Sequence, residues 1–506
     1  MKITYVSHAA LLIEVDGLKI VTDPWLKGSS YCEQWFLFPK PANIENTFDA
    51  DVILYSHGHE DHLHPESLKL LNKNAKLFYP YSWYDGAKPF FDEFGFKNLT
   101  EAVNERTYKI GNDTSVTYFS NNLDNVMVIE SGGKVLVDVN DALHSAPVAV
   151  MQAIISKIKK RWPKIDYVLS SYGGAAYFPN CIKFAGKDDM EIGKTRELFF
   201  LNNFCNFVKL LNPVYAIPFA SDFVLLDEEQ QWMNMVKFPR NQVKEYYKNH
   251  TGNSTSVQVL EMYPGDYIEN DKLVERSSYH QKVKPEGIAY LIKDEYVAKI
   301  EQKKHIVKLT DTQAADVLEK LREHVIKKRY VIPQEKQKKI KYAIQLSDYS
   351  DSKYFNIDLK GAEPKVYMTD VFEKDNILLI KLRSATLLYS MQEEWGGDAI
   401  IIGYGCMIEV YDLNTIKEDL DNLSVRLITN YPNTKEYLQR VPLRAMKYLL
   451  TDSLKRNSLF PGILLGKSEK VNFSDPLLND HLLWLSRTKC EICNACNLPE
   501  KISFSN

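Results

Sequence analysis

Three imidazoles and two carboxylates stand together in the segment His57-Gly58-His59-Glu60-Asp61-His62. An apolar run at residues 51–55, which we expect to be a buried strand, directly precedes this segment. Residues two apart in extended chain point to one side, so His57 and His59 can reach one cation. Packing does not explain such a segment, because buried imidazoles without partners are costly. We therefore predict a metal site with His57, His59, Asp61 and His62 as ligands, rather than a solvated histidine-rich loop, and a catalytic role for Asp61 in taking up a proton.

Three further residues are candidates for roles beside this site. His8, in Ser7-His8-Ala9, is either a core histidine or a catalytic residue next to the metal. Asp23, before Pro24, either orients a ligating histidine through its outer ring nitrogen or only starts a turn. We expect His64 to cap the helix that Pro65 begins or to support a ligand, not to bind the metal itself.

A layered α/β structure has to position these residues. Residues 1–6, 10–15 and 19–22 alternate like strands, and residues 151–161 form an amphipathic helical pattern before Pro163. With 506 residues the chain exceeds one ordinary core, so we expect two domains. The sequence turns charged and turn-rich around residues 265–285, which predicts a first domain at 1–285 and an α+β domain at 286–506. Within the second domain we expect a helix at 310–329 and a strand at 399–410.

The motif His57-x-His59-x-Asp61-His62 after a strand, with Ser7-His8-Ala9 and Thr22-Asp23-Pro24-Trp25 before it, resembles the metallo-β-lactamase superfamily. The resemblance implies an αββα sandwich for the first domain. Within the superfamily, Ser171-Tyr172-Gly173-Gly174-Ala175-Ala176-Tyr177-Phe178-Pro179 and the segment at residues 217–223 resemble the catalytic part of the CMP-N-acetylneuraminate hydroxylase family. That family implies an iron-dependent monooxygenase supplied with electrons by an N-terminal Rieske domain. Since the chain starts at the first strand of the fold, we expect a separate electron-transfer partner.

The later metal ligands of the superfamily are not histidines in this chain, because residues 120–124 and 218–223 contain none. Asp138 or Asp141 is our candidate for the bridging carboxylate and Asp222 for the last ligand, although each is also suited to a turn or a helix cap. A donor set with few imidazoles and more carboxylates suits iron better than zinc. We expect one or two divalent ions, with iron favoured and zinc or manganese as alternatives.

Cysteine recurs at every third residue near the end of the chain, at Cys490, Cys493 and Cys496. These thiols are candidates for a second metal site that holds zinc or an iron-sulfur cluster, and the alternative is a tail of free thiols.

Composition narrows the classes of function. The net charge of −3 gives no reason to expect nucleic acid as a partner. The sequence has no signal-peptide pattern and no run of the ~20 apolar residues that a membrane helix needs, so we expect a cytoplasmic protein with a small-molecule substrate and no membrane association. Three functions remain. They are an iron-dependent oxygenase, narrowly favoured, a hydrolase of phosphodiester, lactone or amide bonds that uses metal-activated water, and a non-catalytic binding protein.

Overall fold

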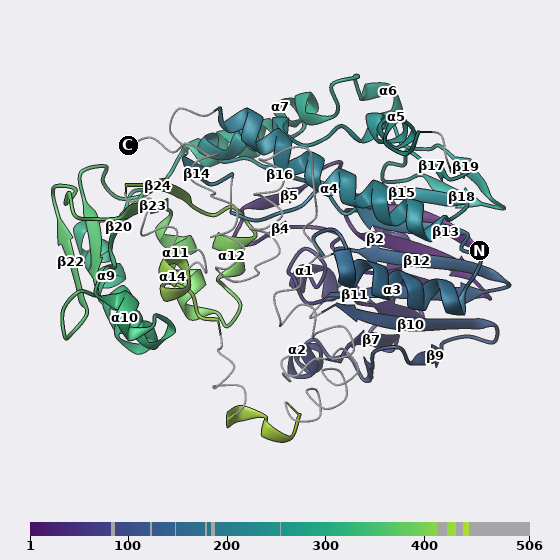
Figure 1. Cartoon of the computed structure of the whole chain (residues 1–506), viewed down its shortest axis with the longest axis horizontal. Coiled ribbons are helices and arrows are strands. Elements are labelled where there is room, and N and C mark those ends of the chain that lie inside the picture. The colour runs from purple at the N-terminus through teal and green to yellow at the C-terminus, as the bar shows by residue number, and fades with distance from the viewer. Residues whose placement is uncertain are drawn as a thin grey trace.

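The computed structural model describes residues 1–81, 87–121, 124–146, 148–177, 180–183, 188–252, 255–411, 423–431 and 439–444. Two large sheets face each other in the N-terminal part, and helices cover their outer faces (Figure 1). The first sheet has the order β19-β18-β1-β2-β3-β6-β7-β8. Its strands are β1 (Lys2–Ser7), β2 (Ala10–Val15), β3 (Leu18–Thr22), β6 (Val52–Leu54), β7 (Lys76–Pro80), β8 (Asn98–Ala102), β18 (Tyr267–Glu269) and β19 (Lys272–Val274).

The second sheet has the order β17-β15-β13-β12-β11-β10-β9. Strands β12, β13 and β15 run parallel, so their carboxyl ends lie at one edge. The strands are β9 (Thr107–Lys109), β10 (Thr114–Asn121), β11 (Asp124–Ser131), β12 (Lys134–Asn140), β13 (Tyr167–Ser171), β15 (Tyr215–Phe219) and β17 (Gln258–Val259).

Alternation along the strands builds the layers. In β11, Met127 and Ile129 point into the core between the sheets, whereas Val126 and Val128 pack against the helices outside. The outer face of the second sheet is covered by α3 (Val148–Arg161), α4 (Asp189–Leu211) and α5 (Arg240–Thr251), and that of the first sheet by α1 (Pro65–Leu68) and α2 (Ala87–Glu93). The expected αββα sandwich is therefore confirmed, and α1 begins at Pro65 as expected.

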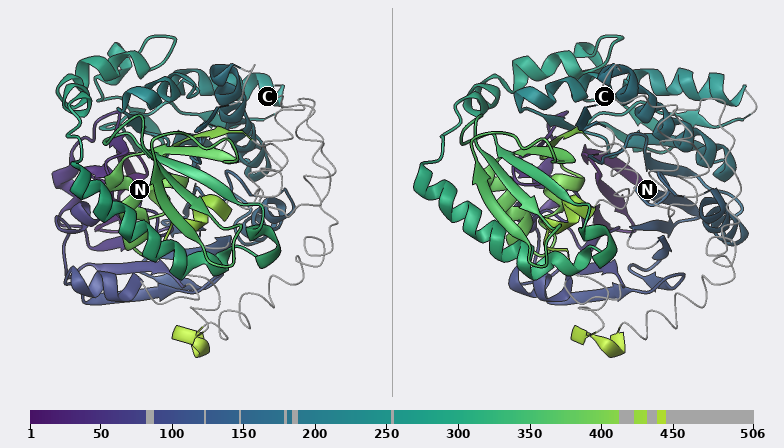
Figure 2. Two further views of the ribbon diagram at one scale, coloured as in Figure 1. Left: turned by 90° about the vertical axis from the view of Figure 1, so that its left-hand side faces the viewer. Right: turned by 60° about the vertical axis from the view of Figure 1, so that its left-hand side comes forward.

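A third sheet, of order β14-β24-β23-β20-β21-β22, organises the C-terminal part, and α9 (Asp311–Lys328) lies across it (Figure 2). Its strands are β14 (Ile182–Lys183), β20 (Lys341–Leu346), β21 (Tyr354–Asp358), β22 (Lys365–Thr369), β23 (Leu378–Leu382) and β24 (Met407–Val410). The remaining elements are β4 (Ser29–Ser30), β5 (Trp35–Leu37), β16 (Phe223–Leu225), α6 (Tyr279–Lys282), α7 (Ile292–Glu295), α8 (Val297–Lys304), α10 (Gln334–Gln337), α11 (Ser384–Gln392), α12 (Asp398–Ile401) and α14 (Leu423–Leu427).

The helix expected at residues 310–329 is present as α9, with Thr310 as its N-cap. The strand expected at 399–410 is wrong in its first half, because Asp398–Ile401 is helical and only Met407–Val410 is extended. Gly403 lies between them, and a side chain there would meet Tyr31 Cβ at 2.6 Å. Apolar residues of a short helix and a turn thus looked like one long strand in the sequence.

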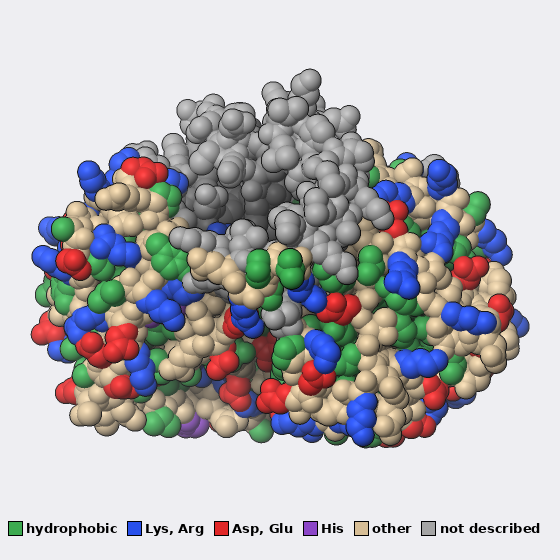
Figure 3. Space-filling view, turned by 90° about the horizontal axis from the view of Figure 1, so that it is seen from below, with side chains coloured by type: hydrophobic (Ala, Val, Ile, Leu, Met, Phe, Trp, Pro, Cys, Tyr) green, Lys and Arg blue, Asp and Glu red, His purple; other side chains and the backbone are tan. Residues whose placement is uncertain are grey.

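Two observations bear on the expected partners, one on the helices and one on the surface. Among the described residues, no helix combines the length and the apolar character needed to cross a membrane. On the face drawn in Figure 3, acidic and basic side chains are interspersed over the described part of the surface.

Candidate metal centre

The metal-binding motif occupies the loop between β6 and α1. A tight turn in this loop, with the amides of His62 and Leu63 both donating to the carbonyl oxygen of His59, at 3.0 and 2.8 Å, turns Asp61 and His62 inward. His57, Asp61 and His62 are buried, whereas His59 is partly exposed. The motif therefore presents its side chains to the edge of the sandwich where β12 also ends.

Side chains from four segments form three overlapping groups, in each of which the potential ligand atoms lie within 4.8 Å of one another. One group is His57, His59 and Asp124; the second is His57, His62 and Asp141; the third is His8, Asp61 and His62. His57 belongs to the first two groups and His62 to the last two, so the arrangement offers room for two neighbouring ions. Such dinuclear sites hold their ions about 3.5–4 Å apart.

The contacts of His62 show that this arrangement fits a cation. His62 Nε2 lies 3.3 Å from Asp61 Oδ2 and 3.4 Å from Asp141 Oδ2, yet this buried nitrogen has no hydrogen-bond partner among the described residues. Burial alone would lower the pKa of His62, but Asp61, Asp141 and Asp23 raise it well above its usual range. A divalent ion at this position would replace the proton and satisfy both carboxylates.

His57 is suited to bind such an ion as a neutral imidazole. Burial, followed by the neighbouring His62 and His59, lowers the pKa of His57 well below its usual range. Its Nε2 lies 2.8 Å from His59 Nδ1 and 4.0 Å from Asp141 Oδ2. His57 Nε2 thus lies near an imidazole nitrogen of one of its two ligand groups and a carboxylate oxygen of the other.

Asp23 connects the metal motif to the strands around it. Its Oδ2 lies 3.2 Å from His62 Nδ1 and accepts a hydrogen bond of 2.6 Å from Ser56 Oγ, while Asn140 Nδ2 donates to the same oxygen. Ser56 Oγ is also 2.8 Å from His57 Nδ1. This contact to the outer nitrogen of His62 sets the ring's tautomer and points Nε2 toward the site.

Replacing Asp23 by asparagine is expected to weaken metal binding about 10- to 100-fold, because the outer hydrogen bond that orients His62 loses its charge. Competition with a fluorescent chelator measures the affinity. The exposed Asp49, which pairs with Lys19 on the surface, provides a matched control in Asp49→Asn. An unchanged affinity in the Asp23 variant would show that Asp23 serves only the turn before Pro24.

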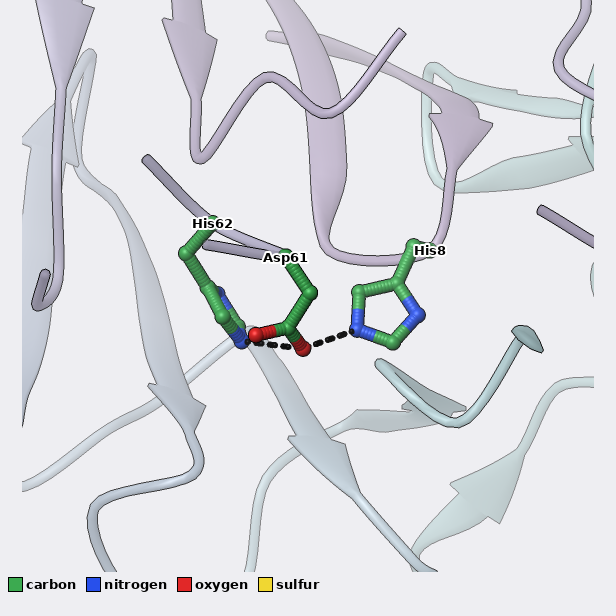
Figure 4. A group of neighbouring side chains, drawn as sticks. All are labelled: His8, Asp61 and His62. Carbon is green, nitrogen blue, oxygen red and sulfur yellow. Dashed lines mark hydrogen bonds and ion pairs between the residues drawn. The ribbon is translucent and has the colours of Figure 1, made fainter. Parts of the chain in front are cut away.

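Asp61 lies between His8 and His62 (Figure 4). His8 Nε2 is 2.9 Å from Asp61 Oδ2, and Tyr31 OH donates to Asp61 Oδ1 at 2.5 Å. Burial would raise the pKa of Asp61, but His62 and His8 hold it well below its usual range. His8 itself has the uncommon φ of 29° in the turn between β1 and β2, which places its ring beside Asp61 rather than in a strand face.

Two of the candidate ligands lie outside these groups. Asp138 sits within β12 and faces the core between the sheets; its carboxyl oxygens have no hydrogen-bond partner among the described residues, and burial raises its pKa well above the usual range. Asp222 instead forms a buried ion pair of 2.5 Å with Arg240 and accepts from Tyr5 OH. Of the candidate carboxylates outside the motif that the sequence suggested, Asp141, which directly follows β12, is the one that belongs to a ligand group.

His64 is also outside the metal groups. It occupies the N-cap position of α1, but its side chain makes no cap hydrogen bond and its Nε2 lies 3.0 Å from the Ser29 carbonyl oxygen. Its ring stacks on Trp25, with centroids 5.8 Å apart. Cys490, Cys493 and Cys496 lie outside the described residues.

The sequence did not identify Asp124 as a candidate ligand. This residue begins β11, and a search for histidine in residues 120–124 passes over it. Its carboxylate belongs to the group with His57 and His59, and burial raises its pKa while His59 opposes this. The available signal was a carboxylate at the end of a hairpin, in the segment where the superfamily has a histidine.

Comparison with known proteins agrees with this geometry. A family model described as "Beta-lactamase superfamily domain" matches residues 2–163. A putative Rieske 2Fe-2S iron-sulfur protein of Mycolicibacterium smegmatis is 23% identical over 247 residues, 46% of this chain and 46% of that protein. The cytidine monophosphate-N-acetylneuraminic acid hydroxylase of Xenopus laevis is 28% identical over 246 residues, 44% of this chain and 38% of that protein. The matches span less than half of the length of these curated relatives.

Among solved structures, CmlA, a diiron β-hydroxylase from Streptomyces venezuelae, is similar at 17% identity, with 54% of each chain covered. The TM-score of this comparison is 0.35. The family match, the αββα layers and the clustered histidines and aspartates together lead to one conclusion. Residues 2–163 match the metallo-β-lactamase superfamily domain, a metalloenzyme fold, and the chain is similar to CMP-N-acetylneuraminic acid hydroxylase.

Proposed function

We propose that this protein is an iron-dependent oxygenase that hydroxylates a small molecule and receives its electrons from a separate donor. The observation that carries the proposal is the composition of the metal centre. Three carboxylates, from Asp61, Asp124 and Asp141, stand among four histidines, and one of them occupies the group with His57 and His59. Carboxylate-rich sets with few imidazoles suit iron or manganese, whereas zinc hydrolase sites are richer in histidine.

The residues present would hold two ions. His57, His59 and Asp124 would bind one, His62 and Asp61 would bind the other with His8 beside them, and Asp141 would lie between the two. Bound iron would supply the activation of oxygen, chemistry that no side chain provides. Electrons must come from outside these residues, and the resemblance to relatives named for Rieske iron-sulfur clusters and for hydroxylation supports this need.

The side chains around the metal site would orient Asp61, supply proton donors to it and exclude water. Tyr31 donates to Asp61 Oδ1, and His8 lies at Asp61 Oδ2, so the carboxylate stays ionised and oriented. Trp25 stands edge-on to His8, with ring centroids 5.3 Å apart, and Trp35 stacks on Phe223 nearby, with centroids 3.5 Å apart. This aromatic wall keeps bulk water from one side of the site and strengthens the electrostatic interactions within it.

Oxygen uptake by protein loaded with ferrous iron without air tests the proposal. We expect about two irons per chain and oxygen consumption that requires iron, a chemical reductant and a small-molecule extract from the host cells. Protein loaded with zinc should consume none, since zinc has no redox chemistry. Tightly bound zinc in the purified protein, with no oxygen uptake after exchange for iron, would contradict the proposal.

The alternative is a hydrolase of phosphodiester, lactone or amide bonds. The buried Asp61 favours it, since its carboxylate is ionised and lies beside His8, where it can accept a proton from a metal-bound water. Turnover of a generic phosphodiester or lactone by the zinc or manganese form would establish this alternative.

A separate experiment tests whether the terminal cysteines carry an iron-sulfur cluster: the iron and sulfide content of Cys490→Ser protein is compared with that of the unaltered protein.

A further inference from the structure

A second cluster of charged side chains lies beside the metal centre, formed by Arg196 and Glu197 on α4 and by Lys237. Arg196 Nη1 donates to Glu197 Oε1 and to the Gly174 carbonyl oxygen, both at 2.8 Å. Lys237 Nζ donates to the carbonyl oxygens of Ser221 and Phe223. We call these three side chains the basic cluster.

The basic cluster has more positive charge than its surroundings neutralise. Arg196 is fully buried, yet its Nε and Nη2 have no hydrogen-bond partner among the described residues. Glu197 balances only one of the two cations, and the nearby Asp222 is already paired with Arg240. Unpaired buried donors on a guanidinium are costly, because they have lost water and gained nothing in return.

The surroundings of Lys237 also leave a positive charge without a full counter-charge. Desolvation lowers the pKa of Lys237 to about 7, despite the attraction of Glu197 and Asp222. Among the described residues, its amine contacts the carbonyl oxygens of Ser221 and Phe223 and the face of the Phe223 ring, 3.1 Å from the ring centroid. An anion at this position would satisfy Lys237 and the free donors of Arg196 together.

The fold places the basic cluster next to the metal ligands. Asp141 follows β12, Gly174 follows β13, and Ser221 follows β15, three parallel neighbours whose carboxyl ends share one edge. Strands lie about 4.8 Å apart, so the cluster is on the order of 5–10 Å from the metal edge. That distance is within the span of a small molecule.

A stack of side chains joins the two sites directly. His144 Nδ1 donates to the carbonyl oxygen of Asp141, and the His144 ring stacks on Phe200 with centroids 5.2 Å apart. The guanidinium of Arg196 lies 4.9 Å from the centre of the same Phe200 ring. Above the buried Arg196 and Glu197, three residues are partly exposed and leave a route for a ligand: Gly174, Ser221 and Lys237.

We propose that the basic cluster binds an anionic group of the substrate, a carboxylate or a phosphate, and thereby holds the reacting carbon at the metal centre. This assignment adds a substrate class to the proposed function, and it rests on that function for the reaction itself. Binding of the anion, however, needs only Arg196 and Lys237 and not the metal. The substrate class is thus a small organic anion.

Calorimetric titration of the full chain with inorganic phosphate and with acetate, in chloride-free buffer, tests the proposal. Both the metal-loaded and the chelator-treated protein are titrated, so that binding to the metal is distinguished from binding to the basic cluster. We expect one of the anions to bind in both forms, and the tighter of the two to identify the group. Lys237→Met should weaken that binding about tenfold or more, because a charge-assisted hydrogen bond is lost.

Arg196→Gln should have an effect of similar size, and Lys237→Met remains informative if the buried Arg196 variant does not fold. The exposed Lys194 on the same helix provides the matched control Lys194→Met, which should bind like the unaltered protein. Binding that disappears with the metal, or affinity that is unchanged in Lys237→Met, would overturn the proposal. Neither result depends on whether the enzyme is an oxygenase.

Discussion

His62→Ala is expected to remove at least one of two metal ions from each chain and to lower turnover by more than about 100-fold. His62 belongs to two of the three ligand groups, and its Nε2 faces both Asp61 and Asp141. Loss of an outer partner of a ligand already costs 10- to 100-fold, so loss of a shared ligand should cost more. Elemental analysis after anaerobic dialysis gives the metal content, and oxygen uptake gives the turnover.

His64→Gln is the matched control for this variant, because His64 lies two residues further along the chain and outside all three groups. It should keep both ions. A His62→Ala protein that is folded and still holds two ions would show that the contacts around His62 are only structural.

Asp222→Ala is expected to lower the free energy of unfolding by about 3–5 kcal/mol while the metal content stays the same. The substitution leaves Arg240 buried without its carboxylate, and Tyr5 OH loses its acceptor. Unfolding in urea, followed by tryptophan fluorescence, measures the change. The double variant Asp222→Leu/Arg240→Met should recover most of the loss, because an apolar pair of similar volume carries no unpaired charge.

This result separates two roles for Asp222. If it were the last metal ligand, Asp222→Ala would lose metal with little change in the stability of the metal-free protein. That outcome would contradict the assignment of Asp222 to the ion pair with Arg240.

Much of the N-terminal sandwich could be predicted because its signals are local. The strands at residues 1–6, 10–15 and 19–22 alternate in the sequence, and the metal motif lies in six consecutive residues after a strand. The C-terminal part of the chain offered weaker signals. Its helix α9 has a long amphipathic pattern and a capping box, whereas the apolar stretch from Ala399 onward hides a change from helix to strand at Gly403 and Gly405.

The remainder of the metal centre depends on contacts that sequence spacing does not reveal. Asp138 and Asp141 are three residues apart and look equivalent, but the former lies within β12, facing the core, and the latter just beyond its end. Asp124 comes near His59 only through the way the second sheet meets the first. Asp222 finds its partner, Arg240, 18 residues further along the chain.

Anomalous diffraction at the iron edge, from crystals grown with ferrous iron in the absence of air, tests the central claim most directly. The account predicts two peaks about 3.5–4 Å apart, one between His57, His59 and Asp124 and one beside Asp61 and His62, with Asp141 reaching both. A centre without bound iron, with these side chains turned away from one another, would contradict it.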